Sequence, residues 1–246
     1  MSNKESGLNT SSKSLNKYLS ENCSCSRREA DKWIEAGRVM INGVLAKKGN
    51  RVTEGDCVLL DGQNIVHQLK PIYLMFNKPP GITCTTDLSD PDNIIDFIGF
   101  HQRIFPIGRL DKPSTGLILL TNDGDIVNEI LRVEHGHEKE YIVKVNQEVT
   151  RDFVHKMERG IPILGTITEP CVVKKINSTV FSITLTQGLN RQIRRMCEYL
   201  GYKVISLKRV RIMHLELGRL PLGQWRELNA QELDILLSST KERTKN

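Results

Sequence analysis

Residues 105–124 constrain the fold of this chain more than any other stretch of its sequence. One acidic residue, Asp111, is surrounded by four turn-forming residues, which are Pro106, Gly108, Pro113 and Gly116. The apolar run that follows at residues 117–120 predicts a buried strand, so Asp111 is expected on a loop held rigidly against a core. In an extended loop Arg109 lies on the same side and keeps the carboxylate ionised. The structural alternative is an Asp that only bonds the amides of its own loop.

The length and charge of the chain limit the functions open to it. Its 246 residues can form one large or two unequal domains. The formal net charge of +6 indicates an anionic partner, without separating RNA from DNA or a membrane surface. No apolar run approaches the ~18 residues of a membrane span, and residues 1–14 lack the apolar core of a signal peptide. We therefore expect a cytoplasmic protein that does not bind membranes.

The cysteines give no sign of a metal site. There are six, and they include no Cys-x-x-Cys pair and no nearby His at ligand spacing. We interpret them as reduced thiols and predict no bound metal.

The N-terminal quarter predicts a small module with a basic face. Residues 1–13 are polar and are expected to form a disordered arm. Ser26 and Glu29 form a capping-box pattern at the start of a helix that ends near Gly37. Three cations lie on the polar side of this helix: Arg27, Arg28 and Lys32. Each alone is explained by solvation, but as a set they favour RNA binding.

Short apolar pieces after Gly37 predict strands separated by Asn-Gly and Gly-Asp turns, so this module combines two helices with a small sheet. It carries the segments Leu-Asn-Lys-Tyr-Leu, Cys-Ser-Arg-Arg-Glu-Ala and Gly-Arg-Val-Met-Ile-Asn-Gly. These segments resemble the S4 RNA-binding domain. We expect that domain at residues 14–62 and a linker at residues 63–71.

A second basic region lies near the C-terminus. Residues 188–196, Gly-Leu-Asn-Arg-Gln-Ile-Arg-Arg-Met, predict the start of a helix capped by Asn190. Residues 191–226 contain seven Arg and two Lys against two Glu, which predicts an electrostatic footprint for a nucleic acid. Arg191 and Arg195 repel each other one turn apart unless they share an anion. For Arg194 the simplest alternative is an exposed pair with Glu198, which stabilises little.

Four motifs in order resemble those of the RsuA-type pseudouridine synthases, and the likeness extends over residues 15–237. They are Asn-Lys-Pro-Pro-Gly at 77–81, Gly-Arg-Leu-Asp at 108–111, His-Glu-Lys-Glu-Tyr at 137–141, and residues 188–196. Helices and strands that mix without strict βαβ alternation independently predict an α+β fold. The resemblance implies a mixed, largely antiparallel β-sheet flanked by helices, here at residues 72–237, before a charged tail at residues 238–246.

The resemblance also implies a reaction and roles for named residues. In this family a uridine in RNA is isomerised to pseudouridine without metal or cofactor, and the motif Asp, here Asp111, is the catalytic residue. It would act as a nucleophile or as a base, which the sequence leaves open. Arg194 would pair with Asp111, and Tyr141 would stack on the flipped uracil. The residues expected to contact RNA in the catalytic domain are Arg109, Leu110, Lys112, Tyr141, Arg191, Gln192, Ile193 and Arg194.

The expected partner is RNA, as 23S ribosomal RNA or a ribosomal assembly particle, and the protein is expected to be a monomer. Alternatives are the same chemistry on small-subunit rRNA or tRNA, and an S4-type binding or assembly protein without activity. A glycosidase needs two positioned carboxylates, whereas the motif supplies one Asp among arginines. A pure RNA binder gains nothing from Asp111, because a carboxylate repels phosphate.

Overall fold

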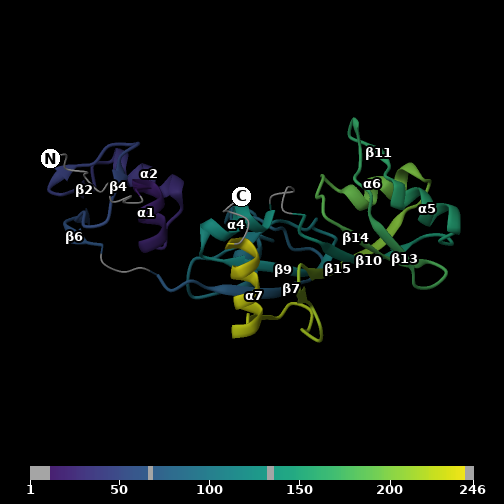
Figure 1. The fold of residues 1–246 in the computed structure, drawn as a ribbon. Helices are drawn as coiled ribbons and strands as arrows, with labels where there is room; N and C mark the ends of the chain where they lie inside the picture. Colours follow the sequence, from purple (N-terminus) through teal and green to yellow (C-terminus); the bar gives the residue numbers. More distant parts are fainter. Residues whose placement is uncertain (1–11, 66–68, 132–135, 242–246) are drawn as a thin grey trace, which may run out of the picture. The chain divides into compact units, whose positions relative to one another are not determined.

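The computed structural model describes residues 12–65, 69–131 and 136–241, and the chain divides into two compact units, Met1–Pro71 and Ile72–Asn246 (Figure 1). Most of the arm expected at residues 1–13, and the tail beyond residue 241, lie outside the described residues. Part of the expected linker, residues 66–68, also lies outside them.

Two helices of the first unit pack their apolar stripes into one small core. The helices are α1 (Leu15–Asn22) and α2 (Arg27–Glu35), and the predicted capping box of Ser26 and Glu29 is confirmed at the start of α2. Leu19, Ala30 and Ile34 are buried at helical spacing and meet the apolar face of the sheet. This burial leaves the polar side of α2 exposed.

The sheet of the first unit is antiparallel, with the strand order β3-β2-β5-β6. Its strands are β3 (Val44–Leu45), β2 (Val39–Ile41), β5 (Val58–Leu60) and β6 (Gln63–Asn64), and β1 (Lys13–Ser14) pairs separately with β4 (Arg51–Val52). Strand β6 occupies positions expected in the linker. The reason is a two-residue hairpin turn, in which Asp61 and Gly62 both adopt positive φ angles, 50° and 79°.

The second unit is built on one mixed sheet, nine-stranded within the described residues, in the order β13-β14-β10-β15-β9-β7-β17 with β16 beside β15 and β8 beside β9. Every pair is antiparallel except β15 with β9, so the predicted α+β fold with a largely antiparallel sheet is confirmed. The strands are β7 (Tyr73–Lys78), β8 (Phe105–Ile107), β9 (Thr115–Thr121), β10 (Lys139–Val145), β13 (Val172–Lys175), β14 (Val180–Leu185), β15 (Val204–Ile212), β16 (Leu215–Glu216) and β17 (Trp225–Glu227). A separate hairpin joins β11 (Pro162–Ile163) to β12 (Thr166–Ile167).

Strands β7 and β9 each have strand neighbours on both sides, and both strands are buried because both of their faces are apolar. Leu117 and Leu119 pack into one core cluster with α4 (Gly124–Leu131) and α7 (Ala230–Lys241). Ile118 and Leu120, which point to the opposite face, pack with α3 (Ile94–Ile98). The predicted buried strand after the Asp111 loop is thereby confirmed.

The remaining helices, α5 (Arg151–Arg159) and α6 (Gln192–Tyr199), cover the half of the sheet formed by β10, β14 and β15. Helix α7 runs to Lys241, whereas the sequence predicted that the catalytic domain ends at residue 237 and that a charged tail begins at 238. Within the described residues no helix combines the length and apolarity of a membrane span.

Candidate active site

Asp111 lies on the loop between β8 and β9, and the buried side chain of Lys78 holds the backbone of this loop. Lys78, at the end of β7, is fully buried, and its Nζ donates to the carbonyl oxygens of Pro79 (2.8 Å), Lys112 (3.2 Å) and Ser114 (2.9 Å). Burial lowers the pKa of Lys78. Because its ammonium has three donors and all three meet carbonyls, the lysine acts as a clamp on the loop.

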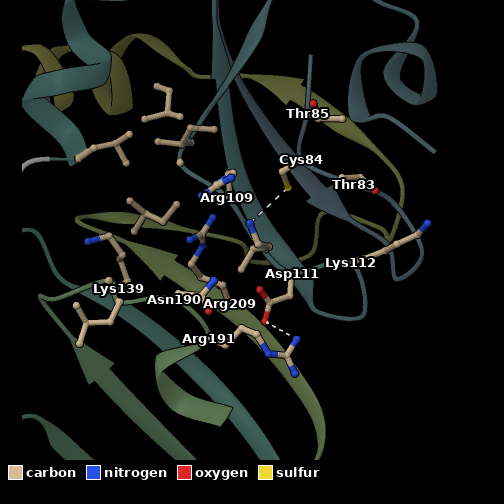
Figure 2. A pocket seen from close by; sticks show the side chains of 18 of the residues that line it. Thr83, Cys84, Thr85, Arg109, Asp111, Lys112, Lys139, Asn190, Arg191 and Arg209 are labelled. Carbon is tan, nitrogen blue, oxygen red and sulfur yellow. Dashed lines mark hydrogen bonds and ion pairs between the residues drawn. The ribbon is translucent and has the colours of Figure 1, made fainter. Parts of the chain in front are cut away.

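Further bonds fix the backbone on either side of Asp111. The Leu110 N–H donates to the Cys84 sulfur at 3.4 Å (Figure 2), and the Ser114 N–H donates to the Asp111 carbonyl at 2.9 Å. The Leu110 side chain is buried in the core between α3 and the sheet. The loop is therefore rigid, as the turn residues predicted.

The carboxylate of Asp111 lies beside two arginines of the α6 region. Its Oδ2 is 3.5 Å from Nε of Arg194 and 3.7 Å from Nη1 of Arg191, and its side chain is 31% exposed. Arg194 is more deeply placed, at 15% exposure, and its Nη2 donates to the hydroxyl of Ser114 at 3.1 Å. The exposed pair of Arg194 with Glu198, the alternative from the sequence, does not form among the ion pairs of the described residues. Burial lowers the pKa of Arg194, Asp111 opposes this shift, and the guanidinium remains charged.

Helix α6 begins differently from the sequence prediction. Its N-cap residue is Arg191, in the left-handed region at φ 51°, and not Asn190. That backbone conformation is uncommon for a residue with a side chain, and here it accompanies a guanidinium beside Asp111. The side chain of Arg195 turns back and donates to the Asn190 carbonyl and side-chain oxygens at 3.0 and 3.2 Å. Arg191 and Arg195 therefore do not share one direction.

The two residues that follow Arg191 have structural contacts: Gln192 bonds to the turn before α6, and Ile193 packs in the hydrophobic core. Gln192 is buried, accepts a bond from the Leu189 N–H at 3.0 Å and donates to Gln187 at 3.1 Å. Ile193 is buried in the core cluster under α6, although it also lines a cavity beside Asp111. Gln192 also lines the cavity beside Asp111, and its side-chain oxygen and nitrogen each have one partner there.

Arg109 and Lys112 flank the loop on its outer side. Arg109 is exposed and forms no ion pair with another described residue, so the expectation that it neighbours the Asp111 carboxylate is wrong. The cations that take this place come from α6, which lies far away in the sequence. Lys112 pairs with Asp92 at 2.7 Å on the exposed surface.

Tyr141 lies on β10 and faces the same space as Asp111. Arg209 is its cross-strand neighbour on β15, with the guanidinium carbon 6.0 Å from the ring centroid. Arg209 is only 4% exposed, and its Nε donates to the Leu117 carbonyl at 2.7 Å. The ring is partly buried between two core clusters, so packing and a ligand would both contact it.

Two cavities meet at Asp111 and Tyr141. The smaller, about 90 Å³, is also lined by Arg194, Ile193 and Leu207. The larger, about 780 Å³, extends past Arg109 to Lys139 and Arg209 (Figure 2). The described residues contain no cluster of three or more His, Cys, Asp or Glu side chains that could hold a metal ion.

The three cations predicted on the first unit, Arg27, Arg28 and Lys32, are exposed on α2 and form no ion pair with another described residue. They remain available for an anionic ligand. Because they belong to the other unit, they form a separate candidate surface.

Several residues of the site had no assigned role from the sequence: Lys78, Cys84, Ser114, Lys139 and Arg209. For Arg209 the sequence contained one signal, the glycine at position 116, which marks a close approach of another strand. A Cβ there would lie 2.2 Å from the Arg209 carbonyl oxygen, so only glycine, at φ +104°, lets β15 approach β9 this closely. The pairing of these strands brings Arg209 beside the Asp111 loop.

Comparison with known proteins identifies the family of this chain. A family model described as "RNA pseudouridylate synthase" matches residues 72–199, and the S4 domain model matches residues 14–58. The chain is 54% identical over 228 residues to "Dual-specificity RNA pseudouridine synthase RluF" of Salmonella typhi, covering 92% of this chain and 79% of that protein. It is 35% identical to "Ribosomal large subunit pseudouridine synthase B" of Bacillus subtilis (strain 168), covering 90% of this chain and 94% of that protein.

A solved structure described as "Crystal structure of pseudouridylate synthase" superposes with a TM-score of 0.66 at 30% identity, covering 91% of this chain and 99% of that one. Extensive sequence identity is thus accompanied by a shared fold. This chain belongs to the RNA pseudouridylate synthase family and is an RNA pseudouridine synthase with an N-terminal S4 domain.

Proposed function

We propose that this enzyme isomerises a uridine of 23S ribosomal RNA, with Asp111 as the catalytic group. The observation that carries the proposal is the position of the Asp111 carboxylate, where the two cavities meet, opposite Tyr141 and beside Arg194. The choice of large-subunit RNA rests on similarity, since a relative named for the large ribosomal subunit is matched over nearly its whole length.

The reaction breaks the N1–C1′ bond of the uridine and forms a C5–C1′ bond after the uracil has turned. The proton leaves C5 and a proton is gained at N1, so the product is an isomer. Asp111 acts either as a nucleophile or as a base toward the ribose, and its rigid loop holds it within reach of one position of the sugar. Arg194 orients the carboxylate, with its Nε 3.5 Å from Oδ2 of Asp111.

The uracil must leave its helix to enter the site, at a cost of a few kcal/mol. The smaller cavity offers the ring of Tyr141 and the aliphatic Leu207 as apolar contacts for a base. Arg109, which is exposed at the mouth and lines both cavities, is placed to fill the space that the base leaves. The basic side of α2 in the S4 domain supplies additional, sequence-independent affinity.

The test is to map pseudouridines by chemical labelling and primer extension in rRNA from cells with and without the protein. Cells that lack it should lose pseudouridine at a 23S position, and wild-type protein, but not Asp111→Asn, should restore it. An unchanged 23S map would contradict the proposed substrate.

A second RNA substrate is favoured by one observation. The relative that is 54% identical is described as dual-specificity. The same mapping should therefore include tRNA and small-subunit rRNA. A pseudouridine there that is lost in cells without this protein would show that the protein also modifies a second RNA.

A further inference from the structure

Two cations in the wall of the larger cavity, Lys139 and Arg209, have no carboxylate partner among the described residues. Arg209 donates through Nε to the Leu117 carbonyl, and its buried Nη2 has no hydrogen-bond partner. Lys139 donates to the carbonyls of His137 (3.0 Å) and Thr186 (3.2 Å), which leaves one N–H of its ammonium. Positive charges taken from water without a counter-ion destabilise the fold unless an anion compensates them.

A β-bulge places these cations on the cavity side of the sheet. Lys139 and Tyr141 are two residues apart on β10 and therefore share a face. Across the ladder Arg209 pairs with Tyr141, whereas Arg211 pairs with Glu140, because the register shifts between those two positions of β10. Arg211 is consequently directed to Glu138 and Glu140, at 2.9 and 3.1 Å, while Arg209 is buried in the cavity wall.

The two charges affect each other. Burial and the neighbouring Arg209 lower the pKa of Lys139. Asp87 and Asp90 also line the large cavity, and they belong to the same segment as Thr83 and Thr85, which lie away from Lys139 in Figure 2. There Asp87 accepts bonds from Ser89, and Asp90 accepts one from the Asp92 N–H. The third carboxylate of the cavity lining, Asp111, lies beside Arg191 and Arg194, so none of the three forms an ion pair with Lys139 or Arg209 in the described part of the chain.

We infer that Lys139 and Arg209 bind a phosphate group of the substrate RNA, next to the nucleotide whose base occupies the smaller cavity. This inference rests on the proposed function for the position of that nucleotide. The large cavity, about 780 Å³, leaves room for backbone beside a base held in the smaller one, about 90 Å³. Two adjacent cations match the full charge of a phosphate better than the neutral edge of a second base.

The first test compares Lys139→Met with the charge-conserving Lys139→Arg. Binding of a 23S rRNA transcript is measured over a salt series, with Lys175→Met as the control, since Lys175 is exposed and pairs with Glu148 outside the cavity. Loss of one phosphate contact should reduce the slope of log K against log salt by about 0.7 to 0.9. Lys139→Arg and Lys175→Met should keep the wild-type slope. An unchanged slope in Lys139→Met, at matched thermal stability, would overturn the inference.

The second test identifies the phosphate. Single neutral methylphosphonates are placed at the phosphates that flank the target uridine. One position should weaken binding of the wild type at least several-fold and have no further effect on Lys139→Met. If the loss of RNA affinity caused by the methylphosphonate is the same in Lys139→Met as in the wild type at every position, Lys139 does not contact a backbone phosphate and the inference fails.

Binding of inorganic phosphate to the protein without RNA tests whether the site takes a free anion or a phosphate of the RNA backbone. If it binds the protein without RNA at millimolar concentration, and does so only when Lys139 is present, the site takes free phosphate and the assignment to RNA is wrong. Both binding tests are independent of turnover. A wild-type enzyme that binds the transcript but forms no pseudouridine in it would count against the proposed substrate, while the slopes would still test the phosphate contact.

Discussion

The guanidinium of Arg194 lies with its Nε 3.5 Å from the carboxylate of Asp111, and that Nε has no hydrogen bond of its own. The distance is long for a charge-assisted hydrogen bond, which is typically 2.7–2.9 Å. In sites without substrate such bonds are often loose and tighten in the reacting complex. The orientation of Arg194 before substrate binds therefore depends on its other partner, the buried hydroxyl of Ser114.

Ser114 is accordingly expected to position Arg194. Ser114→Ala should lower the single-turnover rate about tenfold, corresponding to about 1.4 kcal/mol, with little change in RNA affinity. Ser114→Thr, which keeps the hydroxyl, should recover part of the rate. Ser206→Ala, an exposed position on β15, is the control. Equal loss of rate in the Ala and Thr variants, at matched melting temperatures, would indicate packing instead of positioning.

Gly116 is expected to be essential for the fold of the catalytic unit. Gly116→Ala places a Cβ against the Arg209 backbone and should destabilise the unit by about 3 kcal/mol or more, measured by urea unfolding. Gly165 also has a positive φ, but its Cβ would meet nothing within 4 Å. Gly165→Ala should therefore cost only about 1 kcal/mol. Similar losses of unfolding free energy in both variants would show that the positive φ angle alone, and not the close contact with β15, requires glycine at position 116.

The arginines near the start of α6 should separate into distinct roles. Arg194→Gln should leave the salt dependence of RNA binding nearly unchanged and lower the single-turnover rate. Arg195→Gln should reduce the salt slope by about one unit and leave the rate of bound RNA intact. Arg191→Gln should change both, because its guanidinium is 3.7 Å from Asp111 and half exposed. If Arg194→Gln changed only the salt slope, its assignment to Asp111 would be wrong.

The ring of Tyr141 should matter more than its hydroxyl, because stacking needs only the π-face. Tyr141→Phe should retain much more single-turnover activity than Tyr141→Leu. The comparison is made at matched stability, since the ring also packs against two core clusters. Equal rates for the two variants would leave core packing as its only role.

Much of the fold could be predicted from local patterns. The apolar run at residues 117–120 predicted β9, and the capping box predicted the start of α2. Short elements were missed, among them β6, whose Asp61-Gly62 turn determines the pairing, and α3, a five-residue helix capped by Asn93. Two-residue edge strands bury too little for periodicity to reveal them.

The site was predictable only in part, because the charged residues that surround Asp111 lie far from it in the sequence. Asp111 on a rigid loop follows from the turn residues around it. The proximity of Arg109 in sequence suggested the wrong cation, since the guanidinium groups beside the carboxylate come from Arg191 and Arg194. The left-handed conformation of Arg191 and the clamp by Lys78 depend on tertiary contacts that no local pattern encodes.

The most direct test of the account is the turnover of Asp111→Asn. The substitution keeps the size of the side chain and removes its charge, so the fold and RNA binding should persist. Tritium release from RNA labelled at C5 of uridine, measured under single-turnover conditions with enzyme in excess, should fall to background. Measurable release by Asp111→Asn, in a preparation shown to be free of wild-type enzyme, would contradict the catalytic role of Asp111.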